Sequence, residues 1–249
     1  CIDIVTALYF ATLRVNPQAP KDPNRDRFLL SAGHKAMAQY AVLGRRGYFE
    51  ETLYDTYGSV GSKLGGHPDL HKLPGIEANT GALGHGLSIA AGMALGLRAA
   101  TNGGRVFTVL GDGELPEGAN WEGASIASHH RLDNLVAFVD VNNLQISGPT
   151  AEVMNMEPIA DKFAAFGWNT VTIDGNDIDA VLDAVSTADG EKGRPTVVVA
   201  RTTKAKGISF LEGTLASHYW KPTAEELDRA EREVHARIDN LREWNDHGS

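Results

Sequence analysis

Short apolar runs of two kinds follow one another along the chain, and their alternation predicts a parallel α/β domain. Runs rich in Val, Leu, Ile and Phe have the length of buried strands, and helical patterns separate several of them. The expected strands cover 27–30, 105–110, 135–141, 170–173 and 196–200, and the expected helices cover 2–13, 35–43, 87–100, 120–130 and 178–188. This order predicts a doubly wound, mostly parallel sheet with helices on both faces.

The segments outside this alternation predict loops and one terminal helix. Residues 16–24 and the Gly- and His-rich stretch 58–86 carry few helix or strand signals, and Gly47 is placed to end a helix in the left-handed conformation. Residues 224–244 form a charged amphipathic pattern, whose apolar stripe predicts docking on the chain's own domain, with a partner surface as the second interpretation. The stripe consists of Leu227, Val234, Ile238 and Leu241.

We therefore expect one α/β domain over residues 1–222 and a helical arm over 223–249. No internal repeat is present in the sequence.

The charge, the apolar runs and the single cysteine of the chain limit the kinds of binding partner and cellular location that it can have. The 249 residues carry a net charge of −9 without a dense block of Lys or Arg, which argues against nucleic acid and anionic membranes. No apolar run approaches the roughly 20 residues that cross a bilayer. The single cysteine, Cys1, cannot form an internal disulfide, and this fits a cytoplasmic location.

Candidate chemistry lies at the ends of two neighbouring strands. Gly111-Asp112-Gly113 follows the strand 105–110, and Asn142 follows the next strand after one crossover. Ligands of parallel sheets bind at this edge, and hard oxygen donors with phosphate oxygens suit Mg²⁺. The tripeptide by itself is typical of a turn. Its position after an apolar strand, with Asn142 after the next, favours a site for Mg²⁺ and a diphosphate.

These residues belong to a pattern that resembles the thiamin-diphosphate signature, in which Gly-Asp-Gly precedes an Asn by about thirty residues. The surrounding sequence is similar to the transketolase version of that signature, and the resemblance spans nearly the whole chain. The stretches that carry it are Leu30-Ser31-Ala32-Gly33-His34, Gly66-His67-Pro68, Thr80-Gly81-Ala82-Leu83-Gly84-His85-Gly86, Gly111-Asp112-Gly113-Glu114-Leu115-Pro116-Glu117-Gly118, Val139-Asp140-Val141-Asn142 and Thr202-Thr203-Lys204-Ala205-Lys206-Gly207.

The resemblance implies the thiamin-diphosphate-binding fold of the diphosphate-binding type and a set of cofactor contacts. Asp112, Asn142 and the carbonyl of Leu144 would hold Mg²⁺. Thiamin diphosphate would contact His34, Gly81, Ala82, Leu83, Gly111, Asp112, Gly113, Glu114, Asn142, Leu144, Lys204 and His218.

It also implies roles for three histidines and one glutamate. His34, His67 and His218 would be catalytic, as hydrogen-bond donors and proton shuttles. Glu117 would lie at a subunit interface. Two positions depart from the family pattern: His218 precedes Tyr219 where the family has Gly, and His85 replaces a Gln, so the cofactor contact at that position is expected to differ.

The other histidines point to no further site. His71, His129 and His130 are interpreted as structural or solvated. His67 and His71 are four residues apart, but neither a cysteine nor a helical pattern supports a zinc pair.

The resemblance further implies that the chain does not catalyse alone. Thiamin diphosphate in this family is activated by a glutamate from a second domain, and nothing matching that domain occurs before Ser249. The family's Ser-Gly-His-x-Gly-Gly stretch would precede Cys1, so we expect a truncated N-terminus. The expected protein is the N-terminal subunit of a split transketolase, completed by a C-terminal subunit in a heterotetramer. It would transfer a two-carbon ketol unit from a ketose phosphate to an aldose phosphate.

Three alternatives remain open. The α subunit of a 2-oxo-acid dehydrogenase and a deoxyxylulose-phosphate synthase share the Gly-Asp-Gly turn, although Gly66-His67-Pro68 and the run at 80–86 favour transketolase. A non-catalytic cofactor-binding assembly module is the alternative from another class, and the near-intact set of ligands argues against it. A nicotinamide-binding oxidoreductase is disfavoured because no G-x-G-x-x-G opens a helix after a strand. The sequence does not specify the donor or acceptor sugar, the pathway or the stoichiometry.

Overall fold

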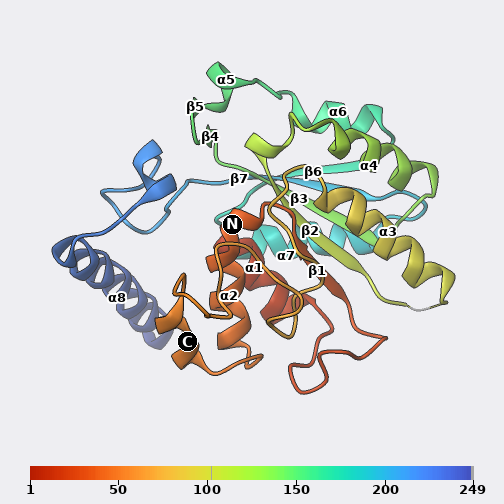
Figure 1. Cartoon of the computed structure of the whole chain (residues 1–249). Coiled ribbons are helices and arrows are strands. Elements are labelled where there is room, and N and C mark those ends of the chain that lie inside the picture. Colours follow the sequence, from red (N-terminus) through yellow and green to blue (C-terminus); the bar gives the residue numbers. More distant parts are fainter. Residues whose placement is uncertain (102, 248–249) are drawn as a thin grey trace.

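A computed structural model describes residues 1–101 and 103–247, with side chains as far as Asp239. Its centre is a parallel five-stranded sheet in the order β1-β2-β3-β7-β6 (Figure 1). The parallel sheet predicted from the sequence is confirmed. Its strands are β1 (Arg27–Leu30), β2 (Val106–Gly111), β3 (Leu135–Val141), β6 (Asn169–Asp174) and β7 (Thr196–Arg201).

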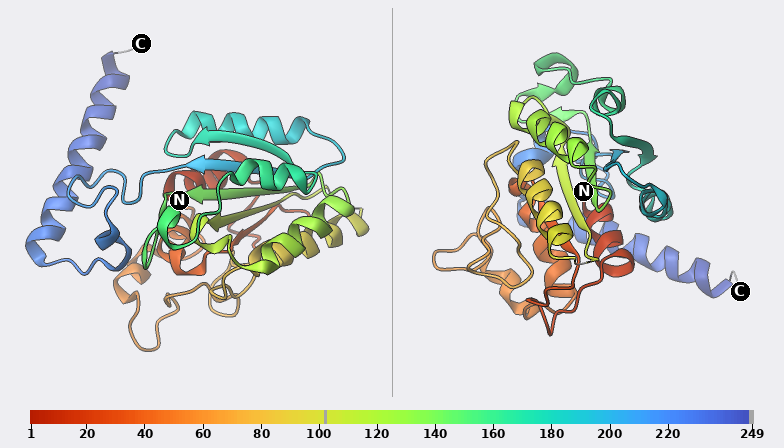
Figure 2. Two further views of the ribbon diagram at one scale, coloured as in Figure 1. Left: turned by 90° about the horizontal axis from the view of Figure 1, so that it is seen from above. Right: turned by 90° about the vertical axis from the view of Figure 1, so that its right-hand side faces the viewer.

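Helices cover both faces of this sheet, so the doubly wound architecture is also confirmed (Figures 1 and 2). One face carries α1 (Ile2–Ala7), α2 (Ala36–Arg45) and α7 (Ile178–Gly190). The other carries α3 (Gly86–Ala99), α4 (Gly118–His129) and α6 (Ile159–Ala165). Within the described residues, the remaining helical elements are six short segments and one long C-terminal helix. They are η1 (Leu8–Thr12), η2 (Gly33–Lys35), η3 (Glu51–Thr56), η4 (Asp112–Glu114), α5 (Thr150–Val153), η5 (Leu215–Tyr219) and the long helix α8 (Ala224–His247).

Alternation along the central strands explains why two cores form. Successive side chains of a strand point to opposite faces. Phe107 of β2 therefore faces the core under α1 and α7, whereas Val106 faces the core under α3 and α4. Every residue of β2 and β3 is buried, as expected for the inner strands of a sheet that is covered on both faces.

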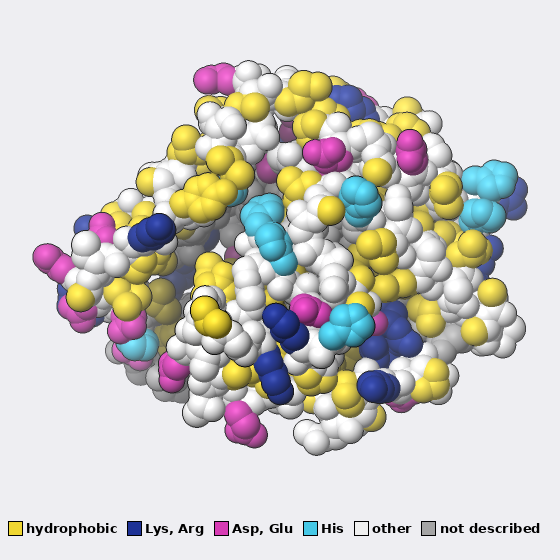
Figure 3. All heavy atoms as spheres, in the orientation of Figure 1, with side chains coloured by type: hydrophobic (Ala, Val, Ile, Leu, Met, Phe, Trp, Pro, Cys, Tyr) yellow, Lys and Arg dark blue, Asp and Glu magenta, His cyan; other side chains and the backbone are white. Residues whose placement is uncertain are grey.

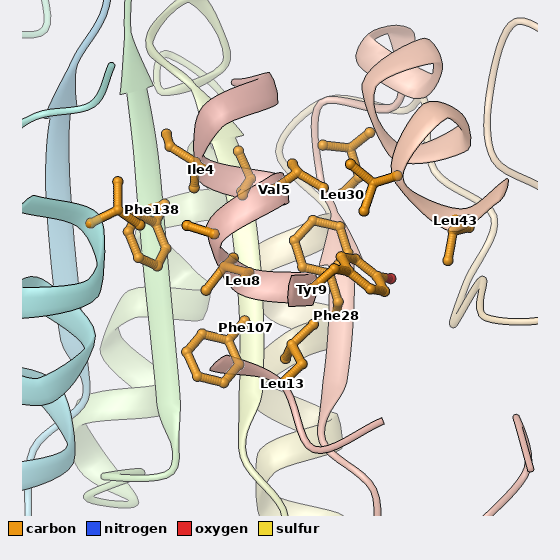
Figure 4. Packing of buried hydrophobic residues seen from close by; sticks show 14 of the residues in the cluster. Ile4, Val5, Leu8, Tyr9, Leu13, Phe28, Leu30, Leu43, Phe107 and Phe138 are labelled. Carbon is orange, nitrogen blue, oxygen red and sulfur yellow. The ribbon is translucent and has the colours of Figure 1, made fainter. Parts of the chain in front are cut away.

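The hydrophobic core between α1 and the sheet attaches the edge strand β1 to the rest of the sheet. Ile4 and Leu8 of the first helical segment pack toward β2 and β3, where Phe107 and Phe138 lie (Figure 4). The rings of Tyr9 and Phe28 meet edge to face, with centroids 5.2 Å apart. Burial of one such side chain stabilises the fold by roughly 1.5–3 kcal/mol. This packing holds the carboxyl end of β1 beside that of β2.

The structure adds short elements that the sequence pattern did not predict. The segment after β3 forms a small antiparallel hairpin from β4 (Leu144–Gln145) and β5 (Gly148–Pro149), followed by α5. α6 lies between β3 and β6, and its seven residues are too few for a clear helical period. Elsewhere the predicted elements agree to within a few residues, and the φ angle of Gly47 is +89° as expected.

The C-terminal helix α8 projects from the domain rather than docking on it (Figures 1 and 2). Its first turns attach to the preceding segment through hydrogen bonds from Ser209 to Glu233 and through Arg229, which lies 4.4 Å from the ring centroid of Phe210. Ala230 is buried in this contact.

The predicted docking of the apolar stripe is therefore wrong for its described members. Leu227, Val234 and Ile238 are 45%, 41% and 40% exposed, because polar contacts hold the helix and leave this stripe turned away. Leu241 lies outside the described side chains, as residues 248–249 lie outside the described chain. Among the described helices, none combines the length and apolar character needed to span a membrane.

Candidate active site

The Gly111-Asp112-Gly113 turn lies at the carboxyl end of β2 and begins η4. The side chain of Asp112 is 5% exposed, and its carboxylate accepts hydrogen bonds from the main-chain N–H of Gly113 at 2.9 Å and of Asn143 at 2.6 Å. Burial raises the pKa of Asp112, while the nearby Lys35 ammonium opposes that rise. The turn thus presents an oriented carboxylate at the edge where ligands of parallel sheets bind.

The second predicted loop follows β3 and reaches the same place. Gly111 of β2 is in register with Asp140 of β3, so the two strands end side by side. Asn142 turns its amide oxygen toward the N–H of Leu144 at 3.1 Å, and Asn143 has a φ of +61°, which tightens the loop. The bond from Asn143 to Asp112 ties this loop to the Gly-Asp-Gly turn. The structure therefore brings Asp112 and the 142–144 loop together, as the crossover length predicted.

Glu114 is buried at the centre of three matched motifs. Its carboxylate accepts hydrogen bonds from the N–H groups of Gly84 and Gly111 at 2.8 and 3.1 Å and from the hydroxyl of Ser31. Its 1% exposure leaves the side chain no surface for a ligand. The oxygens of this side chain therefore hold the loops together, and the expected contact of Glu114 with the cofactor stays a prediction.

Close backbone contacts also join these loops. A Cβ on Gly33 would lie 2.6 Å from the main-chain N of Gly81 and from the carbonyl carbon of Thr80. A Cβ on Gly84, whose φ is +83°, would collide with the side chain of Glu117. Glycine is needed at both positions because neighbouring atoms fill the space that a side chain would take.

A cavity of about 260 Å³ opens beside the ends of β3 and β7, and five residues singled out by sequence or structure meet there. His34 and His218 stack with ring centroids 5.6 Å apart, and Lys204 Nζ lies 2.6 Å from His218 Nδ1. Histidine side chains also border the hollow between the arm and the body of the domain (Figure 3). The residues shared with the prediction are His34, Asn142, Lys204 and His218, and Lys35 is an addition.

Desolvation and neighbouring cations together lower the pKa values of the two histidines in this cavity. His34 is exposed as a whole, but partial desolvation of its ring in the cavity lowers its pKa to about 4, and the cations of Lys35 and Lys204 act in the same direction. Desolvation and Lys204 also lower the pKa of His218. His34 is therefore a neutral imidazole at neutral pH in this structure, where it can exchange hydrogen bonds without carrying a charge.

His67 and the predicted ring-binding loop lie next to this cavity rather than in its lining. A Cβ on Gly81 would lie 2.7 Å from His67 Cδ2, so the exposed imidazole packs against that glycine. Ala82 is exposed and Leu83 is half-buried in the same loop. His85 is exposed, and its Nδ1 lies 3.1 Å from the carbonyl oxygen of Leu83. Glu117 is exposed beside Gly84, a position accessible to another chain.

Two charged residues of the site were missed by the sequence reasoning. Lys35 Nζ donates to Asp140 Oδ2 at 2.5 Å, and the hydroxyl of Thr202 donates to Asp140 Oδ1 at 2.6 Å. Burial favours a raised pKa for Asp140, but the Lys35 ammonium and these hydrogen bonds hold the pKa well below its usual range. The signal was visible in the sequence, because Asp140 is the one charge in an otherwise apolar strand and Lys35 follows His34 directly.

The donor set fits the metal and diphosphate that the motif implies. Among the described residues, no group of three His, Cys, Asp or Glu side chains is arranged to hold a metal ion. The carboxylate of Asp112, the amide oxygen of Asn142 and the carbonyl of Leu144 are hard donors of the kind that Mg²⁺ uses when phosphate completes its shell. The hydrogen bond from Asn143 to Asp112 joins the two loops that carry them.

Comparison with known protein families decides the assignment. The family described as "Transketolase, thiamine diphosphate binding domain" matches residues 1–236. The chain belongs to the transketolase family. It carries the thiamin-diphosphate-binding domain of a transketolase. The relatives that it matches over most of their length are separate transketolase subunits, so this chain is a transketolase subunit as well.

Two curated relatives show the subunit form of the transketolase. One is a subunit of the apulose-4-phosphate transketolase of Phocaeicola vulgatus, which is 42% identical over 245 residues that cover 98% of this chain and 87% of the relative. The other is SqwG, a subunit of the 6-deoxy-6-sulfo-D-fructose transketolase of Clostridium sp., which is 44% identical over 223 residues, covering 90% and 81%. This chain therefore corresponds to most of a subunit in each case.

Solved transketolases share the fold. The transketolase of Campylobacter jejuni superposes with a TM-score of 0.86 at 31% identity, covering 93% of this chain and 37% of that one. The transketolase of Leishmania mexicana gives a TM-score of 0.80 at 26% identity, covering 98% and 44%. The present chain thus spans less than half of these larger transketolase chains.

Proposed function

We propose that this transketolase subunit binds Mg²⁺ and the diphosphate of thiamin diphosphate, and that a separate C-terminal subunit completes the active site in a heterotetramer. The observation that carries the proposal is the junction of the two loops, in which the N–H of Asn143 donates to Asp112 at the edge of the sheet. The cavity beside it contains His34, Lys204 and His218. The names of the subunit relatives support a partner chain.

The residues predicted to hold the metal and the diphosphate have separate parts in this proposal. Asp112, Asn142 and the carbonyl of Leu144 hold Mg²⁺ through oxygen. Gly111 and Gly113 allow the turn to lie against the diphosphate. Lys204 and His218, whose side chains line the cavity and lie 2.6 Å apart, would supply hydrogen bonds to it.

The residues beside the cavity would contact the rings of the cofactor and the substrate. Gly81, Ala82 and Leu83 would line the thiazolium and aminopyrimidine, and His67 would contact the hydroxyls of the sugar. His34 would serve both the diphosphate and the substrate as a neutral hydrogen-bonding group, since its pKa is about 4 in this environment. When bound, thiamin diphosphate supplies a nucleophilic carbon and an electron sink.

The partner subunit provides what these residues do not. We propose that it contributes the glutamate that activates the aminopyrimidine and that Glu117 lies at an interface between subunits. The substrates of the complex are a ketose phosphate as the two-carbon donor and an aldose phosphate as the acceptor. We place the complex in the cytoplasm, where the thiol of Cys1 stays reduced.

Native mass spectrometry tests this function directly. The tagged chain is purified from its host in thiamin diphosphate and Mg²⁺, and the co-purifying proteins are weighed and assayed with ketose and aldose phosphates. A second chain in equal ratio, with ketol transfer that requires both chains, supports the proposal. A lipoyl-bearing assembly, or an inert complex that holds cofactor, contradicts it in favour of a dehydrogenase or an assembly module.

A further inference from the structure

Lys35 crosses the carboxyl ends of the two strands that carry the predicted Mg²⁺ ligands. It ends η2, directly after His34, and its ammonium reaches Asp140 on β3 at 2.5 Å. A Cβ on Gly111 of β2 would lie 3.4 Å from the same Nζ. Because Gly111 and Asp140 are paired in register, one lysine side chain spans both strand ends.

Asp140 accepts a hydrogen bond from this ammonium but does not use all of its N–H donors. The side chains of Lys35 and Asp140 are 16% and 3% exposed. An ammonium has three N–H donors, and in the part of the chain that the structure describes Asp140 is the hydrogen-bond acceptor recorded for Nζ. Thr202 supplies a second hydrogen bond to Asp140, which secures the carboxylate from the other side. Two donors of Lys35 are thus left for a ligand in the cavity that it lines.

The attraction between Lys35 and Asp140 does not by itself account for a lysine at this position. A buried ion pair loses hydration on both partners, and its own attraction offsets this loss only in part. Burial, and after it repulsion by the Lys35 ammonium, lower the pKa of Lys204, while Asp112 and Asp140 act in the opposite direction. An anion between them would relieve this repulsion and use the remaining donors.

We propose that Lys35 is a binding residue for the cofactor's diphosphate, a cation held in place by Asp140 that acts together with Lys204. This inference rests on the proposed function and adds a residue to it, since the family motif that predicted the site ends at His34. Its charge-assisted hydrogen bonds are of the strong class that recognises phosphate oxygens. Lys35 therefore contributes to affinity for diphosphate rather than for the rings of the cofactor.

The test measures dissociation constants by calorimetry on the full chain with its co-purified partner, in Mg²⁺, for two probes: thiamin diphosphate and inorganic diphosphate. Lys35→Met keeps the length of the stem and should weaken both by roughly 10- to 100-fold. Lys35→Arg keeps the charge and should retain most of the affinity. Lys21→Met, an exposed lysine in the loop before β1, is the matched control and should bind both probes as wild type does.

A double variant separates binding from positioning. Lys35→Met alone leaves Asp140 buried without its cation and is expected to be less stable, so Lys35→Met/Asp140→Asn removes the pair as a unit. The proposal expects this neutral pair to fold and still to bind both diphosphates weakly. Wild-type affinity in the double variant would overturn it, since Lys35 would then serve only to neutralise Asp140.

The remaining outcomes distinguish this inference from the proposed function. If wild type binds thiamin diphosphate and Lys35→Met binds it equally well or more tightly, the assignment of Lys35 fails while the function stands. Tighter binding would identify Lys35 as a competitor of Mg²⁺. If wild type binds neither probe, both the function and this inference fail.

Discussion

The main-chain N–H of Asn143 donates a hydrogen bond to the carboxylate of Asp112 over 2.6 Å, although 31 residues separate them in the chain. This bond joins the loop after β3 to the turn after β2. A carboxylate oriented by main-chain groups needs no rearrangement of side chains before it meets a cation. The metal proposal therefore rests on a junction that forms in the protein itself.

Asp112→Asn should abolish Mg²⁺-dependent binding of thiamin diphosphate in a chain that still folds, with some loss of stability because the new NH₂ group faces one of the two N–H donors. The substitution keeps the shape of the side chain but removes the charge that an Mg²⁺ ligand provides. We expect the affinity to fall by at least the roughly 10- to 100-fold that disturbed metal sites lose. Titration of the cofactor at several Mg²⁺ concentrations measures this. Asp183→Asn, on the exposed face of α7, is the control, and a Mg²⁺ dependence that persists in Asp112→Asn would refute the ligand assignment.

Glu114→Gln should destabilise the domain. The carboxylate accepts from two main-chain N–H groups and the Ser31 hydroxyl, and an amide would turn an NH₂ group toward at least one of these donors. Buried hydrogen bonds to a charged acceptor contribute about 1.5–3 kcal/mol each, so we expect a loss of about 2–4 kcal/mol in the free energy of unfolding. Urea denaturation measures it. Glu122→Gln, at an exposed position of α4, should change stability little, and an equal loss in both variants would argue against the bracing role.

Gly33→Ala should cost stability and Gly92→Ala should not. The first adds a Cβ 2.6 Å from main-chain atoms of Thr80 and Gly81, and backbone cannot yield as a flexible side chain would. Overpacking of this kind costs about 1–3 kcal/mol. Gly92 lies on the exposed side of α3 with nothing within 4 Å of its added Cβ, so alanine should stabilise the helix by about 0.5–1 kcal/mol. We expect the urea midpoint to fall in Gly33→Ala and to rise in Gly92→Ala, and an unchanged midpoint in Gly33→Ala would contradict the close contact with Thr80 and Gly81.

Stability should fall on acidification through the window set by His34. Its pKa is lowered from 6.5 to about 4 in the folded chain, so between these values the unfolded chain binds more protons. Stability is then fully present above pH 6.5 and declines as the pH falls toward 4. Urea midpoints at about pH 7 and about pH 5 measure the decline, which should be smaller in His34→Gln. His71→Gln, on an exposed loop, controls for the loss of an imidazole, and an identical decline in wild type and His34→Gln would contradict the shifted pKa.

The layered fold, and the strand ends at which the site lies, follow from the amino-acid pattern alone. Strand β3 was bounded correctly because an unbroken apolar run of seven residues has no stable place except the inside of a covered sheet. The crossover between β2 and β3 then placed Asp112 and the Asn142 loop at one edge. The motif at 80–86 could be aligned with the family pattern because glycines with positive φ tolerate few replacements.

Which side chains meet is settled by the packing of distant segments. Lys35 and Asp140 are 105 residues apart and pair because η2 and β3 converge at the edge of the sheet, which no local pattern encodes. Glu114 became a brace because three loops enclose it, and α8 left its stripe exposed because polar contacts hold its first turns. Periodicity reports which face of an element is apolar. Charge pairing and docking depend on distances between segments that are far apart in the chain, and these distances exist only after folding.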